Sequence, residues 1–297
     1  MSQFVDRLVS VTLEAPKASQ TASFYVNDWG LTLAAQSEGR AFLHGSGNEH
    51  HILELSDRPE TRLGAVTLSS PDRAALERLH SKATAQGVRI IAAPAEQTGP
   101  AGGYGFSLLD PEGRRINIVA GLATRADTSG VRGQPIKISH VVINTPQVQA
   151  MQQFYCDLFE FVVSDWSESQ MVFIRCNGDH HNIAFNRAEF PSLNHVSFLM
   201  RSEESVRESM ARMEGRGRPV KWGAGCHGIG GIMFAYFIDP NGFVIEYNHY
   251  VRAFDPNTHE AKVWKRTKET MDSWGTAGIP SSEIRDAMSG GFQSRPG

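Results

Sequence analysis

The sequence predicts an α+β fold made of tandem βαβββ modules that form two curved-sheet domains. A length of 297 residues suits two domains of ordinary size, each with its own core. Sliding the chain along itself reveals an internal repeat at an offset of 129 to 130, with these matches: Phe24-Tyr25 and Phe154-Tyr155, His50-His51 and His180-His181, and the Asp-Pro-x-Gly turns Asp110–Gly113 and Asp239–Gly242. Strand and helix patterns also follow one another in the same order in both copies.

The first copy illustrates the module. Residues 8–16 alternate and end at a proline, which predicts a strand running into a loop. Residues 17–29 carry a helix pattern that ends before Gly30, a plausible C-cap. Strands follow at 40–43, 51–55 and 64–68, and a helix at 71–86 that stops at Gly87. Residues 88–91 are expected to be extended, and 105–119 to form a hairpin. Each module divides into two similar halves. The second half begins at Gly64 in the first copy and at Asn194 in the second copy.

These patterns divide the chain into four parts. We expect an N-terminal module without a metal site at 1–123, a linker at 124–135, a catalytic C-terminal module at 136–250 and a tail at 251–297. Apart from a few apolar anchors the tail is polar, which predicts a short helix and loop packed on the second module. Residues 289–297 are expected to be disordered.

Composition excludes several classes of function. Hydrophobic residues make up 40% and charged residues 21%, as in a soluble globular protein. The net charge is −3 without basic or acidic blocks, which argues against a nucleic-acid or anionic-membrane partner. No apolar run reaches membrane-spanning length and the N-terminus does not resemble a signal peptide, so we expect a cytoplasmic protein. Three cysteines without CxxC spacing argue against a disulfide framework and a thiolate zinc site.

The segment 225–247 carries the most chemistry. Its turn Asp239–Gly242 is flanked by aromatic and β-branched runs, which predicts a strand, a tight turn and a strand. Glu246 lies inside the second apolar run. A buried carboxylate costs several kcal/mol unless a cation or a metal ion compensates its charge. The sequence must therefore supply a partner for Glu246.

Comparison of the two copies separates scaffold from chemistry. The second copy has His140, His195 and Glu246 where the first copy has Ser10, Ala65 and Asn117. Two imidazoles and a carboxylate from separate strands form the ligand set of non-haem Fe(II), which leaves coordination positions open. Zinc or manganese could use the same set. Each histidine alone could be structural, but the matched absence of all three from the first copy favours a metal site.

Further polar residues crowd the same strands. Alternation allows only one of His180 and His181 to point into the cavity, and the first-copy doublet His50-His51 suggests that part of this pattern is scaffold. His227 opens the hairpin, and Tyr236 replaces Ser107 of the first copy. A lone strand tyrosine is usually a core residue, but this one shares its hairpin with Glu246.

These residues resemble those of two-module (type I) extradiol ring-cleaving dioxygenases of the vicinal oxygen chelate superfamily. The resemblance rests on the three ligand positions and on the signature Gly225-x-His227, Tyr236-x-x-Asp239-Pro240-x-Gly242-x-x-x-Glu246, and it covers about residues 8–250. One departure is Ala235, where the family usually has a larger apolar residue.

The resemblance implies Fe(II), or Mn(II), held by His140, His195 and Glu246, with a catechol-type diol and O2 as substrates. His181 matches the acid–base histidine of the family, and His227 and Tyr236 match its partners of the substrate oxygen. The implied reaction is extradiol (meta) cleavage that inserts both oxygen atoms and gives a hydroxymuconic semialdehyde-type product, as in aromatic catabolism. The family also implies a homo-oligomer.

Two other functions use the same scaffold. One is a metal-dependent glyoxalase-like isomerase or lyase, and the other a non-enzymatic resistance protein that sequesters its ligand. The dioxygenase reading fits better because the first copy offers no ligands and because His181, His227 and Tyr236 suit oxygen chemistry. Candidate residues for lining the substrate cavity are Met171, Phe173, Phe185, Ile229 and His249.

Overall fold

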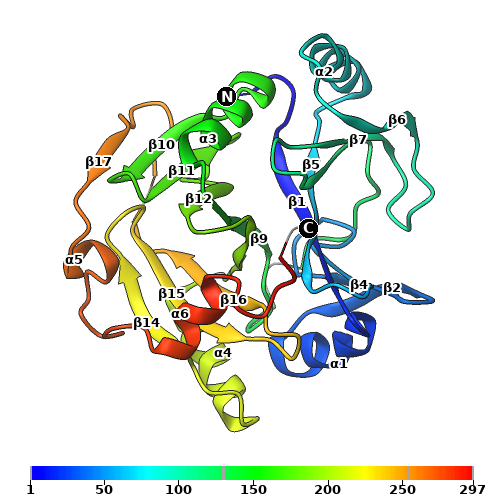
Figure 1. The fold of residues 1–297 in the computed structure, drawn as a ribbon. Helices are drawn as coiled ribbons and strands as arrows, with labels where there is room; N and C mark the ends of the chain where they lie inside the picture. The colour runs from blue at the N-terminus through cyan, green and yellow to red at the C-terminus, as the bar shows by residue number, and fades with distance from the viewer. Residues whose placement is uncertain (1, 129–130, 253, 296–297) are drawn as a thin grey trace.

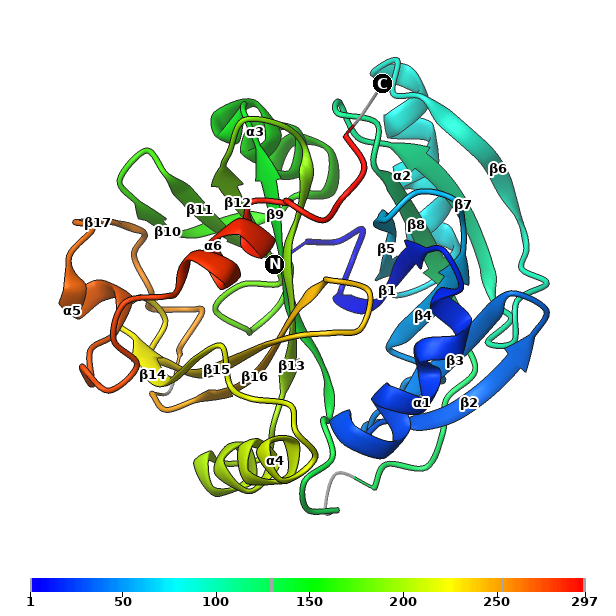
Figure 2. The same cartoon turned by 60° about the horizontal axis from the view of Figure 1, so that its bottom comes forward.

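The computed structural model describes residues 2–128, 131–252 and 254–295, and it contains two large sheets, each built from one half of the chain (Figures 1 and 2). The first sheet has the order β2-β3-β4-β1-β5-β8-β7-β6. Its strands are β1 (Arg7–Ala15), β2 (Thr32–Ser37), β3 (Arg40–His44), β4 (Leu53–Asp57), β5 (Arg62–Ser69), β6 (Ile90–Glu96), β7 (Tyr104–Leu109) and β8 (Arg115–Ala120). We call residues 7–120 the first module.

The second sheet has the same order when it is read from the opposite end, β14-β15-β16-β13-β9-β12-β11-β10, and it adds β17 next to β10. Its strands are β9 (Lys137–Thr145), β10 (Val162–Ser167), β11 (Met171–Arg175), β12 (Ile183–Arg187), β13 (Ser192–Leu199), β14 (Trp222–His227), β15 (Ile232–Ile238), β16 (Val244–Tyr250) and β17 (Lys262–Trp264). We call residues 137–250 the second module. The predicted α+β class with two curved sheets is confirmed.

Helices α1 to α4 each follow the first strand of a half-module, and α5 and α6 belong to the tail. They are α1 (Ala22–Phe24), α2 (Arg73–Ala85), α3 (Val148–Phe159), α4 (Glu203–Gly215), α5 (Lys268–Met271) and α6 (Ser282–Met288). The expected single helix at 17–29 is instead a 3-10 turn, α1 and a π-turn in succession, closed by Gly30 at φ 96°. The sequence pattern missed β2, whose residues are mostly half-buried or exposed and include none of the large β-formers. No helix of the described residues is long and apolar enough to cross a membrane.

Strand register is reproduced between the modules. His195 pairs with Val142 as Ala65 pairs with Thr12. In the hairpins, Tyr236 pairs with Glu246 as Ser107 pairs with Asn117. The positional comparison made from sequence therefore corresponds to equivalent places in the two sheets.

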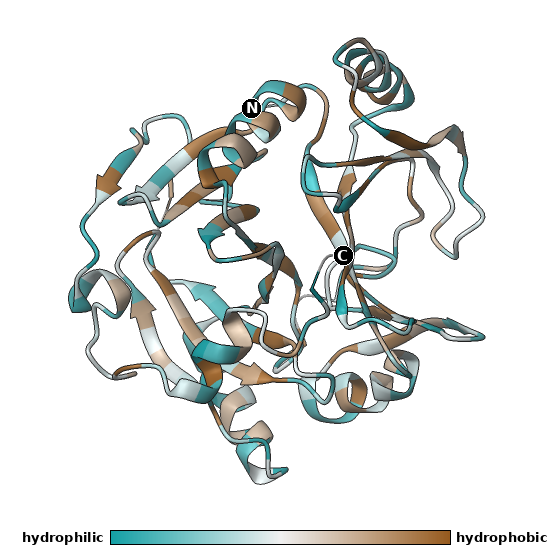
Figure 3. Cartoon of the chain, viewed as in Figure 1, coloured by the Kyte–Doolittle hydropathy of each residue, from teal (hydrophilic) through white to brown (hydrophobic). Residues whose placement is uncertain are grey.

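The modules pack through their repeated residues. The hydroxyl of Tyr25 donates to Asp239 of the second module at 2.8 Å, and that of Tyr155 donates to Asp110 of the first at 3.4 Å. The π-turn at 25–29 contacts α4, and α2 contacts α3, so helical segments of the two modules lie next to each other in pairs. One continuous hydrophobic core includes residues of both modules, and the strands carry much of the hydrophobic colour in Figure 3.

The tail passes along the outer edge of the second module as β17 and α5, and α6 then lies against β13 and β16 (Figure 1). The expectation of disorder after residue 288 is wrong for the described part. The Gln293 side chain bonds both the backbone N–H and the carbonyl of Leu193, and Ser294 N–H donates to Thr61 O of the first module. These bonds fix the end of the chain across both modules; residues 296–297 lie outside the described residues.

Candidate metal centre and active-site cavity

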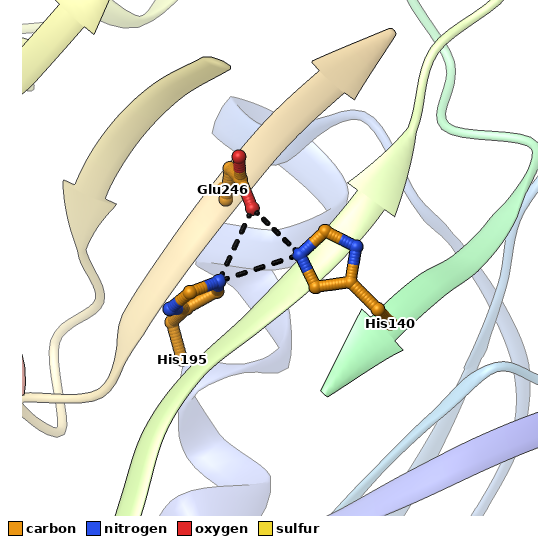
Figure 4. Close-up of side chains that lie close together, drawn as sticks. All are labelled: His140, His195 and Glu246. Carbon is orange, nitrogen blue, oxygen red and sulfur yellow. Dashed lines mark hydrogen bonds and ion pairs between the residues drawn. The ribbon is translucent and has the colours of Figure 1, made fainter. Parts of the chain in front are cut away.

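Three side chains converge at the middle of the second sheet (Figure 4). His140 is on β9, His195 on β13 and Glu246 on β16, three neighbouring strands. Glu246 Oε2 lies 3.2 Å from His140 Nε2 and 3.3 Å from His195 Nε2, and the two Nε2 atoms are 3.4 Å apart. All three residues are buried. One cation could therefore contact all three atoms.

The carboxylate of Glu246 has an unusual environment. Neither oxygen has a hydrogen-bond partner among the described residues, although the side chain is fully buried. Burial raises the pKa of this carboxyl, but His140 and His195, when they carry a proton on Nε2, lower it below the ordinary range. The group is thus an anion whose close neighbours are two ring nitrogens. A divalent cation supplies the compensation that such a group requires.

Neighbouring side chains orient both imidazoles. His195 Nδ1 lies 2.8 Å from Asn194 Oδ1, which can only accept, so Nδ1 carries the proton and Nε2 is free as a ligand. His140 Nδ1 lies 3.3 Å from Ser139 Oγ, which accepts a hydrogen bond from Asn248. Burial lowers the pKa of His140, which favours the neutral, metal-binding form. This donor set matches that of a divalent metal site.

His181 lies beside this centre and lines the cavity, with its ring centroid 4.2 Å from that of His140. Burial is the main reason that its pKa is lowered well below the ordinary value, and repulsion from His140 adds to it. The ring is therefore neutral, and one of its nitrogens has a free lone pair. His180 points away from the cavity and bonds Asp165.

His227 and Tyr236 form a hydrogen-bonded pair in the cavity lining. His227 Nδ1 donates to the carbonyl of Met271 in the tail at 2.8 Å, so its Nε2 accepts from the Tyr236 hydroxyl at 3.0 Å. Burial lowers the pKa of His227. Burial and, next, the charge of Glu246 raise the pKa of Tyr236 well above its usual value. The pair therefore presents a neutral imidazole and a neutral phenol to the cavity.

The cavity has a volume of about 680 Å³ and extends from His140 and His195 to the tail. Of the candidate lining residues, Met171, Phe173 and Ile229 line it. Phe185 and His249 do not. Strand alternation places Asn186 on the cavity side, so Phe185 turns into the core against Tyr155 at 5.1 Å between ring centroids. His249 is an odd number of residues from Glu246, and its ring bonds Met200 O instead.

Several residues of the site were missed from the sequence. Tail residues form much of the cavity mouth, among them Arg266, Thr270, Met271, Pro280, Arg285 and Met288. The first copy has no counterpart of the tail, so comparison of the copies could not find them. Asp165, which bonds His180, could have been found, since Ala35 occupies its place in the first copy.

Comparison with known proteins places this site in context. Residues 137–247 match the model of the Glyoxalase/Bleomycin resistance protein/Dioxygenase superfamily. Metapyrocatechase 2 of Cupriavidus necator is 26% identical over 166 residues, 48% of this chain and 52% of the relative. Biphenyl-2,3-diol 1,2-dioxygenase of a Pseudomonas species is 27% identical over 213 residues, 66% of this chain and 72% of the relative. The chain spans about half the length of the first of these relatives.

Solved structures extend the likeness to the whole chain. Homoprotocatechuate 2,3-dioxygenase from Brevibacterium fuscum has the same fold, with a TM-score of 0.83 at 19% identity over 92% of this chain and 79% of the other. A Mn(II)-bound glyoxalase from Novosphingobium aromaticivorans is 31% identical with a TM-score of 0.90, over 100% of this chain and 96% of that one. The chain therefore belongs to the Glyoxalase/Bleomycin resistance protein/Dioxygenase superfamily.

Proposed function

We propose that the protein cleaves a catechol-type aromatic diol outside its two hydroxyls, inserting both atoms of O2 to give a hydroxymuconic semialdehyde-type product. The observation that carries the proposal is the buried, uncompensated Glu246 between two imidazole Nε2 atoms, opening on a cavity that also holds His181, His227 and Tyr236. The relatives named as catechol and biphenyl-diol dioxygenases support it.

His140, His195 and Glu246 would hold the metal, which we propose to be Fe(II). Two histidines and one carboxylate bind one face of such an ion and leave positions for ligands from solution. When bound, the ion would favour ionisation of a diol hydroxyl and bring the diol and O2 together. Mn(II) could replace it with the same ligands, in line with the manganese in the related glyoxalase.

The remaining roles belong to this chain's own side chains. His181, neutral in its buried position, would accept a proton from a diol hydroxyl and later return it to the product oxygen. The Tyr236 hydroxyl, which bonds His227, would turn toward the substrate oxygen next to the cleaved bond and stabilise its charge. Phe173 and Ile229 would pack against the ring and exclude water.

The cavity mouth points to a substituted diol. The volume of about 680 Å³ lies in the range that holds drug-sized ligands, so the ring has room for a sizeable substituent. Arginines outnumber acids in the cavity lining, which includes Arg187, Arg266, Arg285 and Arg295 but only Glu189 and Asp286 as acids. None of these arginines forms an ion pair within the described ranges. We propose a polar or anionic substituent.

A metal-dependent glyoxalase-like isomerase is the second candidate, because the related protein with 31% identity is a glyoxalase. The two reactions differ in oxygen demand: ring cleavage consumes O2, and isomerisation does not. A ligand-sequestering protein would need neither metal nor turnover.

The test is anaerobic reconstitution with Fe(II) followed by an absorbance screen of substituted catechols in air-saturated buffer. Extradiol cleavage predicts a yellow ring-fission product and oxygen uptake equal to the catechol consumed. A chain that binds iron but consumes no oxygen with any catechol, while isomerising a glyoxalase substrate, would replace the proposal with the second candidate.

A further inference from the structure

A chain of hydrogen bonds leads outward from the cavity through His181. Its Nδ1 lies 3.0 Å from His180 Nδ1, and His180 Nε2 lies 2.9 Å from Asp165 Oδ2. All three side chains are buried. The neighbouring rings confine the doublet further, since Phe173 contacts His181 edge-to-face at 5.0 Å and Phe254 contacts His180 at 5.2 Å.

The first module contains the same doublet without the carboxylate. His50 Nδ1 lies 3.2 Å from His51 Nδ1, and Phe42 contacts His51 at 5.1 Å in the same edge-to-face manner. Ala35 pairs with Phe42 as Asp165 pairs with Phe173. The doublet and its aromatic neighbour are therefore repeated scaffold. Asp165 is present only in the module that also has His140, His195 and Glu246.

Asp165 decides which nitrogens carry protons. Hydrogen bonds from His180 and from Lys262 N–H outweigh burial and lower its pKa, so it is an ionised group that can only accept. His180 Nε2 therefore carries a proton, and its Nδ1 in the neutral ring has a lone pair. That lone pair accepts from His181 Nδ1–H. The nitrogen left to His181 on the cavity side, Nε2, is then unprotonated.

The tail secures this arrangement. Lys262 N–H donates to Asp165 Oδ1 at 2.9 Å, where β17 pairs with β10, which reserves Oδ2 for His180. His259 lies 3.5 Å from Oδ2 and donates from Nε2 to Ser164 O at 2.9 Å. Asp165, His180 and His259 could also hold a metal ion by the spacing of their donor atoms, but each ring Nε2 already has an acceptor.

We propose that Asp165 is a positioning residue that acts through His180 to keep His181 in the tautomer with an unprotonated Nε2 facing the substrate. The consequence for turnover rests on the proposed function, because only there does His181 act as a base. The tautomer itself does not depend on that function. A carboxylate that orients a catalytic imidazole in this way has a precedent in the serine protease triad.

Asp165→Asn is the decisive variant. Its amide oxygen must accept from Lys262 N–H, so its NH2 group faces His180 Nε2 and donates to it. His180 then carries its proton on Nδ1 and donates to His181 Nδ1, which moves the His181 proton to Nε2. The substitution thus inverts both tautomers while preserving the size of the side chain.

The first readout is the tautomer of each ring. Full-length protein labelled with ¹⁵N-histidine and loaded with diamagnetic Zn(II) is compared with Asp165→Asn by long-range proton–nitrogen NMR. We expect His181 to be protonated at Nδ1 in the parent chain and at Nε2 in the variant. Identical tautomers in both proteins would overturn the proposal. So would two metal ions per parent chain with loss of one in the variant, since the cluster would then be a metal site.

The second readout is kinetic and uses the iron-loaded enzyme. We expect Asp165→Asn to lower kcat by about 100-fold or more, with unchanged KM for the catechol and unchanged iron content. Asp165→Glu, which keeps the carboxylate, should recover part of kcat. Ala35→Asn places the same amide beside the first-module doublet and should leave kcat unchanged. A variant with inverted tautomers but full kcat would contradict the role assigned to Nε2.

The two readouts separate the possible failures. If no catechol is turned over by the parent chain, the proposed function fails while the NMR comparison still tests the tautomers. If the tautomers are unchanged but catechols are cleaved, only the positioning role fails.

Discussion

The hairpins β7–β8 and β15–β16 share one turn and one register but differ at the positions that face the middle of their sheets. In the first, the Asn117 amide oxygen accepts from Ser107 and its NH2 group donates to Thr67. In the second, Glu246 takes the place of that amide, and both its oxygens are without hydrogen-bond partners in the described part of the chain. The first module thus forms a satisfied polar cluster where the second forms a cation site.

In the turns of the same hairpins, it is the first module that has a buried ion pair and the second that lacks one among the described residues. Asp110 and Asp239 each accept two backbone N–H groups of their own turn and one tyrosine hydroxyl from the other module. Asp110 also pairs with the buried Arg114 at 2.8 Å, but the matching position in the second module is Phe243. The charge is therefore compensated in the scaffold turn of the first module and not in that of the second.

The largest expected effect comes from removing the carboxylate that distinguishes the two sheets. Glu246→Ala should reduce the metal content from about one ion per chain to almost none and lower turnover by more than about 100-fold. Mutation of a residue that only hydrogen-bonds to a metal ligand already lowers metal affinity or activity about 10- to 100-fold, so loss of the ligand itself should cost more. Elemental analysis after anaerobic loading measures this. Asn117→Ala is the matched control and should bind metal normally; full metal content in Glu246→Ala would sink the assignment.

The next contrast is between the equivalent histidines His181 and His51. His181→Ala should keep iron and substrate binding but lose about 10²- to 10⁴-fold in turnover, the usual range for a general acid–base group. Steady-state oxygen uptake measures the loss of turnover, and catechol binding under nitrogen measures the retained affinity for substrate. His51→Ala should keep full turnover, and equal rates in the two variants would remove the distinction between the doublets.

The aspartates of the two turns should differ in stability. Asp110→Asn removes one of the two carboxylates that pair with the buried Arg114, and Glu112 remains. Loss of such a charged hydrogen bond costs about 1.5 to 3 kcal/mol in the free energy of unfolding. Asp239→Asn removes a buried charge that no cation compensates, so we expect a change below about 1 kcal/mol. Urea unfolding of both variants at neutral pH measures these free energies. Equal losses of stability would show that the pair of Asp110 with Arg114 does not stabilise the fold.

The last contrast concerns the pH dependence of stability. Burial raises the pKa of Asp239 to about 6 from its usual 3.8. The stability tied to its protonated form is therefore present below pH about 4 and lost as the pH rises through 6, up to about 3 kcal/mol in all. The Tm of the parent chain relative to Asp239→Asn should fall between pH 4 and 7. A constant difference over that interval would mean that Asp239 does not titrate there.

Much of this contrast was readable from the sequence because each module supplies an internal reference for the other. Asp-Pro-x-Gly marks a turn by its own chemistry, since Gly113 and Gly242 adopt φ of 83° and 89°. Residues His140, His195 and Glu246 stood out because their counterparts have no ligand groups. The structure brings these three side chains within 3.4 Å of one another.

Other features depend on tertiary contacts that local patterns do not encode. The direction of Phe185 follows from strand pairing, which the sequence of a single strand does not fix. His249 was predictable, because it lies three residues from Glu246 on the same strand and so faces the opposite side of the sheet. The tail reaches the cavity because Lys262 pairs with β10 and Met271 accepts from His227. Neither contact has a local sequence signal, and the tail has no copy with which it could be compared.

Ring cleavage under isotopically heavy oxygen tests the central claim most directly. The Fe(II)-loaded protein is mixed with a substituted catechol under ¹⁸O2, and the product is analysed by mass spectrometry. Our account predicts a ring-opened product that carries two heavy oxygen atoms, formed by the parent chain and by Asn117→Ala but not by Glu246→Ala. A product without heavy oxygen, or equal yields from all three proteins, would contradict it.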